Sequence, residues 1–462
     1  MNQNEENNGV NRRDFIRGGS IATLMTMLGG VPLVAAEAPA AAPVNGSKIK
    51  IALVGCGAWG RELLRTLAQL PVAEVVAVCD TYGASARKAA ADVPGAKVVA
   101  DYNELLSDKS VQAVILATPT HKHRDVAIAA LKAGKHVYCE VPLAHSIEDA
   151  KAIALAAKAA PRQIFQSGLQ LRSDAQTALL LPFFRTGKLG NWIMGRAQWN
   201  KKMSWRAASP KPEREKELNW RLDKTTSHGL LGEIGIHQLD RAALVFNARP
   251  TAVMGYGSLV QYKDGRDVPE TVQAMFEFPN QIQYTYNATL ASGFDADYEV
   301  YHGTFATVVC REDKAWMFKE VDSELFGFEV YCRRDRFFRE TGIALIAGAS
   351  KQDALSAKPD DPVLPTRTAP YQALNNFLKN VASMKNKVSS FTEALGKEEG
   401  AALDEEESQA LQESIAKEVL PRLTPAASAE DGFSATVTAI KANEAILSRQ
   451  RLEFKDAWYQ LS

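Results

Sequence analysis

The chain has 462 residues, of which 46% are hydrophobic and 23% charged, and its 54 basic and 54 acidic side chains leave no formal net charge. This composition is typical of a globular protein with a sizeable core, and it excludes collagen-like, disordered and disulfide-scaffold classes. A neutral chain lacks the basic surface that neutralises nucleic-acid phosphates, so we expect no nucleic-acid partner. The length predicts two domains, at roughly 100–200 residues per domain.

The five cysteines are an odd and sparse set without a C-x-x-C pair. Their spacing predicts neither a zinc site nor a disulfide framework, and we expect no metal. Cys79 and Cys139 end apolar runs, which predicts that both are small buried core residues.

Residues 1–40 differ in character from the rest of the chain. The paired Arg12 and Arg13 precede an apolar stretch at 21–34, and small residues crowd 35–42. This order is typical of an export signal, and the apolar stretch is shorter than the ~20 residues that span a bilayer. The paired arginines resemble a twin-arginine signal. We therefore expect export to the periplasm by the twin-arginine machinery, without a stable membrane anchor. The alternative is an unstructured basic N-terminus of a cytoplasmic protein.

Between residues 47 and 165, short β-rich runs alternate with helical patterns, which predicts an α/β domain with a doubly wound parallel sheet. The candidate strands are 49–54, 74–79, 97–100, 111–118, 136–139 and 163–165.

A glycine motif directly follows the first of these strands and precedes a helical stretch at 61–69. Gly55 permits a tight turn, Gly57 leaves room for a pyrophosphate at the helix start, and Gly60 lets helix and strand pack closely. A lone motif of this type is weak, but here the strand, turn and helix are all present. The alternative is a glycine turn in a fold that has lost its cofactor.

Asp80 ends the second strand, about 20 residues beyond the motif, where a carboxylate accepts hydrogen bonds from an adenosine ribose. The same carboxylate would repel a 2′-phosphate, so NAD is favoured over NADP. The expected cofactor-binding residues of this region are Gly55, Gly57, Ala58, Trp59, Gly60 and Asp80.

Several further runs agree in order and spacing with one family. Together with the glycine motif, they resemble the Gfo/Idh/MocA family, over about 47–345 and again over 428–455. The runs are Ala-Thr-Pro-Thr-His-Lys-His at 117–123, Gly-Lys-His-Val-Tyr-Cys-Glu-Val-Pro-Leu-Ala at 134–144, Trp-Arg-Leu-Asp at 220–223 and Gly-Glu-Ile-Gly-Ile-His-Gln-Leu-Asp at 232–240.

The resemblance implies an N-terminal Rossmann domain and a C-terminal α+β domain with an open, mostly antiparallel sheet. Nicotinamide would lie between the domains, over a carbohydrate substrate, and we expect a homo-oligomer. The expected segments are a cofactor domain at 47–165, a substrate and oligomerisation domain at 166–349, a family-atypical helical insertion at 350–427, and a closing helix and tail at 428–462.

The resemblance also implies cofactor contacts at Thr118, Pro119, His123 and Glu140. One departure from the family is chemical. Family members usually carry a lysine after the glutamate, placed to assist proton transfer, and here the position is Val141. Because valine cannot relay a proton, the usual lysine-assisted dehydrogenase chemistry is in question. Family members that hydrolyse glycosides by transient oxidation can also lack this lysine.

Glu233 and His237 stand where many relatives have Asp-x-x-x-His. Side chains four residues apart emerge on one face of an α-helix, so the carboxylate is expected to orient the imidazole and support its protonated form. The pair then acts as the catalytic acid/base near neutral pH, with His237 taking the hydroxyl proton. The alternative is a buried structural histidine and a surface glutamate.

The candidate substrate residues are His228, Gln170, Arg172 and Trp220. Gln170 and Arg172 follow the sixth strand and can hydrogen-bond sugar hydroxyls, Trp220 can stack on a sugar ring, and His228 either lines the pocket or caps a loop. Lys201 and Lys202 are candidates to replace the missing lysine, or form a solvated basic pair.

The second half of the chain is strand-rich, with alternating patterns at 194–199, 252–256, 272–278, 281–288 and 305–310. Trp199, Trp205, Tyr284 and Tyr286 are either core residues or sugar-stacking residues. Residues 371–384 and 393–420 are expected to be helical. The second of these is acidic, which predicts a solvated excursion, or alternatively a lid or an oligomer contact.

These observations favour an exported oxidoreductase that acts on a sugar or glycoside hydroxyl with tightly bound NAD. The first alternative is a glycoside hydrolase that works by transient oxidation and elimination. The second is a non-catalytic sugar-binding relative.

Overall fold

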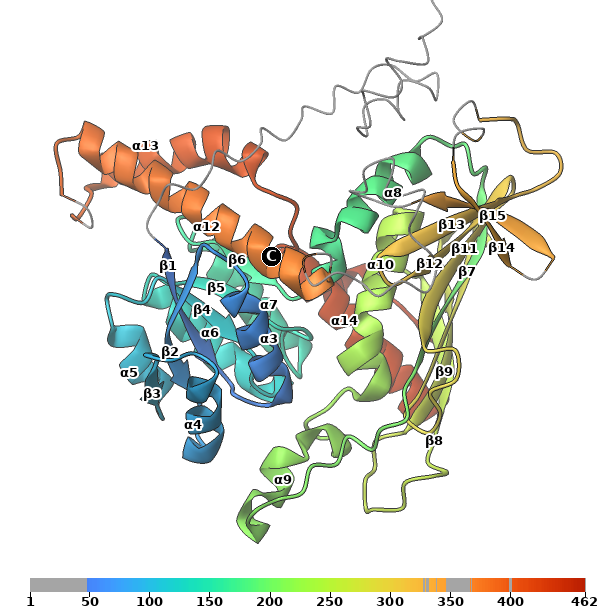
Figure 1. Cartoon of the computed structure of the whole chain (residues 1–462), viewed down its shortest axis with the longest axis horizontal. Helices are drawn as coiled ribbons and strands as arrows, with labels where there is room; N and C mark the ends of the chain where they lie inside the picture. Colours follow the sequence, from blue (N-terminus) through green and yellow to red (C-terminus); the bar gives the residue numbers. More distant parts are fainter. Residues whose placement is uncertain are drawn as a thin grey trace, which may run out of the picture.

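Two β-sheets, one parallel and one mostly antiparallel, organise the chain in the computed structural model (Figure 1). The structure describes residues 48–326, 329, 332–337, 339–345, 366, 368–398 and 401–461. The fold class predicted from the sequence is confirmed. The expected export signal at residues 1–40 lies outside the described residues. Among the described helices, none combines the length and apolar character needed to cross a membrane.

The first sheet has six parallel strands in the order β3-β2-β1-β4-β5-β6. This order reverses direction between β1 and β4, so a crevice forms outside the carboxyl ends of these strands. The strands are β1 (Ile49–Val54), β2 (Ala73–Cys79), β3 (Lys97–Val99), β4 (Ala113–Leu116), β5 (His136–Cys139) and β6 (Phe165–Ser167), and the helices between them are α3 (Ala58–Ala68), α4 (Gly83–Ala91), α5 (Tyr102–Ser107), α6 (His123–Lys132) and α7 (Ile147–Lys158).

Both faces of the first sheet are covered, which is why its strands are continuously apolar. Alternate side chains of β1 enter two different cores. Ile51 and Leu53 pack with α3 and with the long helix α12 (Ala369–Ala394), whereas Ala52 and Val54 pack with α6 and α7 and with the last helix, α14 (Ala429–Ser448).

The second sheet has ten strands in the order β14-β15-β13-β12-β11-β7-β10-β9-β8-β16. Among the pairs that the structure describes in this second sheet, β7–β10 is parallel and the others are antiparallel. The strands are β7 (Trp192–Asn200), β8 (Ala252–Ser258), β9 (Thr271–Glu277), β10 (Gln283–Thr289), β11 (Asp297–Gly303), β12 (Ala306–Arg311), β13 (Lys314–Lys319), β14 (Arg334–Phe337), β15 (Glu340–Leu345) and β16 (Leu452–Glu453).

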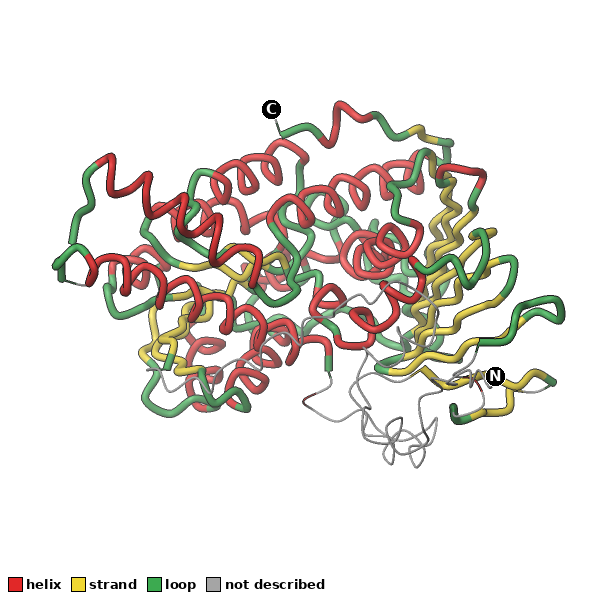
Figure 2. The backbone as a smooth tube through the Cα atoms, turned by 90° about the horizontal axis from the view of Figure 1, so that it is seen from above, coloured by secondary structure: helices red, strands yellow, loops and turns green. Residues whose placement is uncertain are grey.

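Helices lie on one side of this second sheet, as Figure 2 shows, and Figure 1 identifies two of them as α8 (Ala175–Arg185) and α10 (Ile236–Phe246). The core between helices and sheet is aromatic. Phe246 of α10 lies 6.1 Å from the Tyr284 ring and 5.7 Å from the Tyr301 ring, centroid to centroid. Tyr284 and Tyr286 are fully buried, so of the two roles considered for them, core packing is the one the structure shows.

The segment expected to be a helical insertion packs its apolar face on the first sheet. Leu374 and Phe377 of α12 are fully buried there, and Phe377 meets Tyr138 of β5 edge to face at 5.8 Å. Helix α13 (Glu405–Ser414) runs back along α12 and buries Leu411 in the same core (Figure 1). Glu405, Glu406 and Glu413 of α13 are exposed, whereas Glu407 is partly buried in an ion pair with Lys397.

The helix boundaries in this segment differ from the expectation. Helix α12 continues to Ala394, and α13 begins only at Glu405. A capping box explains the restart, because Asp404 accepts a hydrogen bond from the Glu407 amide while the Glu407 side chain accepts one from the Asp404 amide.

Helix α14 contacts both domains. The Thr436 hydroxyl accepts a hydrogen bond of 2.9 Å from the Leu143 amide, next to the carboxyl end of β5. Gly432 lies so close to β6 that a Cβ there would stand 2.1 Å from the Ser167 Oγ. Farther along, Ala445 and Ile446 enter the core of the second sheet. The two domains therefore share one helix as their common wall.

Candidate active site

The glycine motif forms the start of α3 with the geometry expected of a phosphate cradle. A Cβ at Gly60 would stand 1.9 Å from the Gly55 carbonyl oxygen, and one at Gly55, where φ is +98°, would stand 2.5 Å from the Ala117 carbonyl oxygen. At Gly57, the N-cap of α3, nothing lies within 4 Å of that position, and no side chain caps the helix. The space above Gly57 is therefore left by the protein for something else, next to uncapped amides that favour an anion.

Asp80 lies at the carboxyl end of β2 and is held by backbone donors. Its Oδ2 accepts from the Cys56 amide at 2.8 Å and its Oδ1 accepts from the Tyr82 amide at 2.8 Å. These bonds tie the carboxylate to the glycine motif. Asp80 thus lies beside the cradle, where a ribose hydroxyl would reach its remaining lone pairs.

The loop after β4 supplies Thr118 and Pro119 to the same crevice. The Thr118 Oγ1 is buried and has no hydrogen-bond partner among the described residues. His123 has a different role from the predicted cofactor contact. Its ring nitrogens lie 2.9 Å from the Thr118 carbonyl oxygen and 3.0 Å from the Pro142 carbonyl oxygen, and burial lowers its pKa to about 4. His123 joins the loops after β4 and β5 from below, so it positions the crevice without facing it.

Glu140 directly follows β5 and is buried. Burial raises the pKa of its carboxyl group to about 7, against the opposing effect of Trp59, Tyr138 and Gln170 around it. Its Oε1 has no hydrogen-bond partner in the described part of the chain. Gly168 makes room for the carboxylate, because a Cβ there would stand 2.8 Å from the Glu140 Oε2.

The expected pair of Glu233 and His237 is not formed. The Glu233 carboxylate accepts from Thr120 Oγ1 at 3.0 Å and from the His228 amide at 3.1 Å, and His237 has no hydrogen bond to it. The reason is local: residues Leu231–Gly235 form a π-helical turn, across which the spacing of a regular α-helix does not hold. Glu233 instead joins the second domain to the loop after β4.

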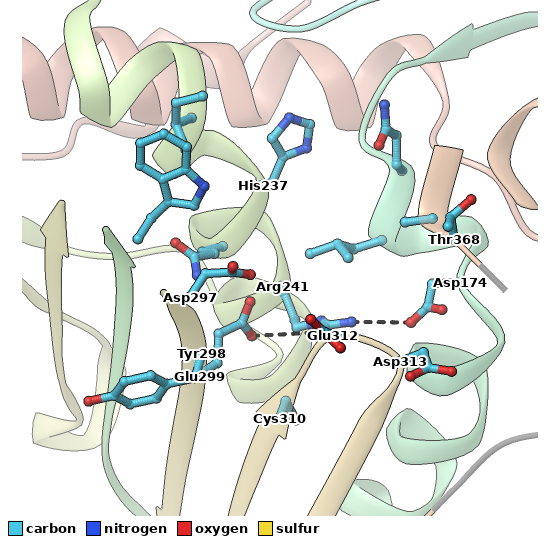
Figure 3. Close-up of a pocket in the computed structure, with 16 residues that line it drawn as sticks. Asp174, His237, Arg241, Asp297, Tyr298, Glu299, Cys310, Glu312, Asp313 and Thr368 are labelled. Carbon is cyan, nitrogen blue, oxygen red and sulfur yellow. Dashed lines mark hydrogen bonds and ion pairs between the residues drawn. The ribbon is translucent and has the colours of Figure 1, made fainter. Parts of the chain in front are cut away.

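His237 is one of the residues that line a cavity of about 400 Å³ between α10 and the second sheet (Figure 3). Burial alone lowers the pKa of its imidazole to about 4, so the ring is neutral near neutral pH and can accept a proton. The lining next to His237 is polar. Arg241, one turn further along α10, donates to Thr177 at 2.7 Å and to Asp174 at 3.2 Å, and the carboxylates of the lining give acceptors for a hydroxyl-rich ligand.

Two of the four predicted substrate residues are occupied by other partners. Arg172 makes a bidentate pair with Asp240, both bonds at 2.8 Å, and an ion pair with Asp431 at 2.7 Å. Each nitrogen of its guanidinium is thus engaged by one of these carboxylates, and Arg172 is not among the residues that line the cavity at His237. Trp220 is buried against His121 and does not line the cavity below His237.

Gln170 is the predicted substrate residue that reaches both parts of the site. It lines the cavity below His237 and also faces the Glu140 carboxyl group. His228 lies on the cofactor side, stacked on His145 with ring centroids 4.5 Å apart, and its Nε2 has no partner among the described residues. Burial lowers its pKa to about 4. The candidate lysines Lys201 and Lys202 are exposed.

Arg221 is a site residue that the sequence analysis did not select. Burial lowers its pKa, and the carboxylates of Glu233 and Glu140 oppose that shift. Its guanidinium carbon lies 4.4 Å from the Trp220 ring centroid, and within the described residues no hydrogen bond or ion pair engages it. The replacement of the family lysine by Val141 was the available signal, because a missing cation suggests a search for another one nearby.

The geometry of these residues fits a nicotinamide dinucleotide. The open space at Gly57, the positioned Asp80 carboxylate and the unpartnered atoms of Thr118 and Glu140 lie along one crevice at the carboxyl ends of β1, β2, β4 and β5. A dinucleotide in this crevice would bring its nicotinamide to the Glu140 end, next to the second domain.

Comparison with known proteins agrees with this geometry. Residues 49–168 match the oxidoreductase family with an NAD-binding Rossmann fold, and residues 183–309 match the Gfo/Idh/MocA C-terminal domain. The chain belongs to the Gfo/Idh/MocA family of oxidoreductases, and its first domain is the NAD-binding domain of that family.

Named relatives are sugar and cyclitol enzymes. The chain is 37% identical to inositol 2-dehydrogenase of Salmonella typhimurium over 149 residues, which is 32% of this chain and 44% of the relative. It is 28% identical to levoglucosan dehydrogenase of Pseudarthrobacter phenanthrenivorans over 239 residues, 46% of this chain and 59% of the relative. The match thus spans less than half the length of the inositol enzyme.

Solved structures show the same fold over most of the chain. Levoglucosan dehydrogenase in complex with NADH and L-sorbose superposes with a TM-score of 0.64 at 20% identity, over 89% of this chain and 100% of that one. An oxidoreductase domain protein from Kribbella flavida gives a TM-score of 0.64 at 21% identity, over the same shares.

Alanine substitutions at Gly57 and Gly60 test cofactor binding and folding separately. Because a Cβ at Gly57 meets only open space, Gly57→Ala is expected to keep the unfolding temperature of the NAD-free protein and to weaken NAD binding at least tenfold. Gly60→Ala is expected to lower the free energy of unfolding by about 2 kcal/mol or more, since its Cβ overlaps the Gly55 carbonyl. Calorimetric titration with NAD and thermal unfolding measure the two effects. Unchanged affinity in Gly57→Ala would contradict the cradle.

The buried carboxyl of Glu140 predicts a pH dependence of stability. Folding raises its pKa from about 4.5 to about 7, so the NAD-free folded chain binds the extra proton between these values, and the free energy of unfolding falls as the pH rises through this window. Glu140→Gln is expected to gain on the order of 2 kcal/mol relative to wild type between about pH 5 and about pH 8. Denaturant unfolding at the two pH values measures it, with the exposed Glu74→Gln as the control. An equal pH dependence in both variants would contradict the assignment.

Proposed function

We propose that the protein is an oxidoreductase that acts on a hydroxyl of a sugar or glycoside with tightly bound NAD. One observation carries this proposal: the cavity at His237 adjoins the nicotinamide end of the cofactor crevice, and Gln170 belongs to both. The relatives named as inositol 2-dehydrogenase, levoglucosan dehydrogenase and 1,5-anhydro-D-fructose reductase support a carbohydrate or cyclitol substrate.

NAD held along the crevice at Gly57, Asp80 and Glu140 would supply the acceptor for a hydride from the carbinol carbon of the substrate. His237 takes the hydroxyl proton on a ring nitrogen, because burial keeps the imidazole neutral and its lone pair free. In the reverse direction the same nitrogen returns the proton. Asp174 and Thr177 hold Arg241, so the lining of the cavity next to His237 is fixed and offers its acceptors to the other hydroxyl groups.

Arg221 supplies a positive charge where the family lysine is absent. It lies near both Glu140 and Glu233 and favours their ionised forms. We assign it a positioning role that acts through Glu140, whose carboxylate stands at the nicotinamide end. Residue Val141 itself contributes only a buried apolar surface.

The absent lysine also supports a second candidate, a hydrolase that uses NAD catalytically. In this candidate, oxidation of one carbon acidifies the neighbouring C–H, the glycosidic bond leaves by elimination, water adds, and the carbon is reduced again. The net reaction is redox-neutral. It needs a base at the same place, so His237 serves either reaction.

The experiment that tests the function uses purified protein and a panel of sugars, cyclitols and aryl glycosides. The oxidoreductase reading predicts bound nicotinamide that becomes reduced with substrate and stays reduced, measured by absorbance. Released aglycone without lasting reduction identifies the hydrolase.

His237→Ala is expected to lower kcat/KM by about 10²–10⁴-fold in either case, and retained turnover would contradict its role.

Arg221→Leu is expected to shift the pH profile of kcat/KM toward higher pH, since the pKa of Glu140 rises without the cation. Arg221→Lys is expected to restore part of this shift.

For residues 1–40, we propose an export signal of the twin-arginine type, on the pattern of paired arginines, apolar stretch and small residues alone. Cell fractionation is expected to find the mature chain outside the cytoplasm. Arg12→Lys combined with Arg13→Lys is expected to retain the chain inside. Export of this variant at the wild-type level would contradict the proposal.

A further inference from the structure

The second domain sends a long connection back to the first. Residues 201–222, called the strap below, leave β7 and end in the 3₁₀ turn Trp220–Leu222, and they include the short helix α9 (Glu215–Leu218). In Figure 1, α9 projects away from the second sheet, on the side of the first domain. None of the cofactor, substrate or acid/base roles derived above uses α9.

The strap meets the first domain immediately after Asp80. The Thr81 hydroxyl donates to Glu217 Oε1 at 3.0 Å, and the Arg214 guanidinium carbon lies 3.8 Å from the Tyr82 ring centroid. Arg214 also donates from Nε to Glu217 Oε2 at 3.1 Å. Two residues of the strap thus engage the two residues that follow the ribose-binding carboxylate. A cation over an aromatic ring at this distance is attractive by the ring quadrupole.

One donor of Arg214 is unused. The Arg214 side chain is only 16% exposed, and its Nη1 is buried without a hydrogen-bond partner among the described residues. A buried guanidinium nitrogen without an acceptor is costly, so an acceptor in the ligand-bound protein would restore the lost bond. The adenosine part of NAD carries acceptors of the required kind, which are its ribose oxygens and adenine ring nitrogens.

The base of the strap is stiff. Arg206 is bonded to Glu215 and Asp264, with 2.8 Å to the latter. The side chain of Asn219 donates to the Ala207 carbonyl and accepts from the Ala207 amide at 3.0 Å and 2.8 Å. These bonds join the two arms of the strap, so α9 is held near Tyr82 before any ligand binds.

We infer that the strap is a clamp on the adenosine end of NAD, in which Arg214 contacts the cofactor and the Thr81–Glu217 and Tyr82–Arg214 contacts close the crevice behind it. The cofactor then leaves only when both contacts open. This inference concerns cofactor retention, and it holds whether the substrate reaction is oxidation or redox-neutral hydrolysis.

The test measures release and affinity, not turnover. Protein loaded with NADH is mixed with excess NAD, and the loss of NADH fluorescence gives the dissociation rate. Arg214→Met keeps the apolar stem and removes the guanidinium, and Thr81→Val removes the hydroxyl that reaches Glu217. Both are expected to release NADH at least tenfold faster than wild type, and Glu213→Gln, an exposed residue of the same strap, is expected to release it at the wild-type rate.

Fragments of the cofactor locate the contact. Arg214→Met is expected to bind ADP-ribose at least tenfold more weakly and nicotinamide mononucleotide as well as wild type does. Unchanged release of NADH in both folded variants would overturn the clamp, as would an equal loss for the two fragments. A wild-type preference for NADPH that Arg214→Met abolishes would also overturn it, in favour of a phosphate contact. Should Arg214→Met fail to fold, Thr81→Val and Tyr82→Leu decide the same question by release rate.

Discussion

The docking of α14 against the parallel sheet is the contact on which the site depends. Gly432 has no side chain and so leaves room for Ser167, and the Thr436 hydroxyl accepts a hydrogen bond from the Leu143 amide. These two contacts fix the helix beside the carboxyl ends of β5 and β6. The same helix enters the core of the second sheet. Because one rigid element belongs to both domains, the cavity at His237 keeps its place next to Glu140 without a large interface of its own. A larger residue at 432 would separate two surfaces that the chemistry needs side by side.

Burial moves the titratable groups of the site toward their neutral forms. The pKa values of Glu140 and Glu233 are raised, and those of His237 and His228 are lowered, with desolvation as the largest cause in each case. Charges interact more strongly where water is excluded, so the largely buried guanidinium of Arg221 acts on the nearby carboxyl groups of Glu233 and Glu140. The loss of the family lysine at Val141 therefore does not leave the nicotinamide end without a positive charge.

The sequence predicted those parts of the site that depend on backbone geometry. The strand, the three glycines and Asp80 occur as expected, because glycine spacing and strand order determine where a crevice forms. The sequence did not predict which partner a polar side chain binds when several are available in the folded protein. Arg172 pairs with Asp240 and Asp431, and Glu233 accepts from Thr120, and these partners are separated from them by up to 259 positions in the chain. The π-helical turn before His237 gave no signal in the spacing. Strand β14 was not predicted because its Arg-Asp-Arg-Phe sequence is neither apolar nor clearly alternating.

Because α12 lies late in the sequence, the first domain completes its core late in synthesis. The face of the parallel sheet that carries Ile51, Leu53 and Tyr138 is covered by Leu374 and Phe377, and the opposite face needs Phe433 and Val437 of α14. A ribosome releases these covering helices only after the whole second domain has been made. The nucleotide-binding domain therefore cannot complete its core as an N-terminal unit, as domains often do. Its folding closes a loop of several hundred residues, so a chain interrupted before α12 would expose an apolar sheet surface to the cell's chaperones and proteases.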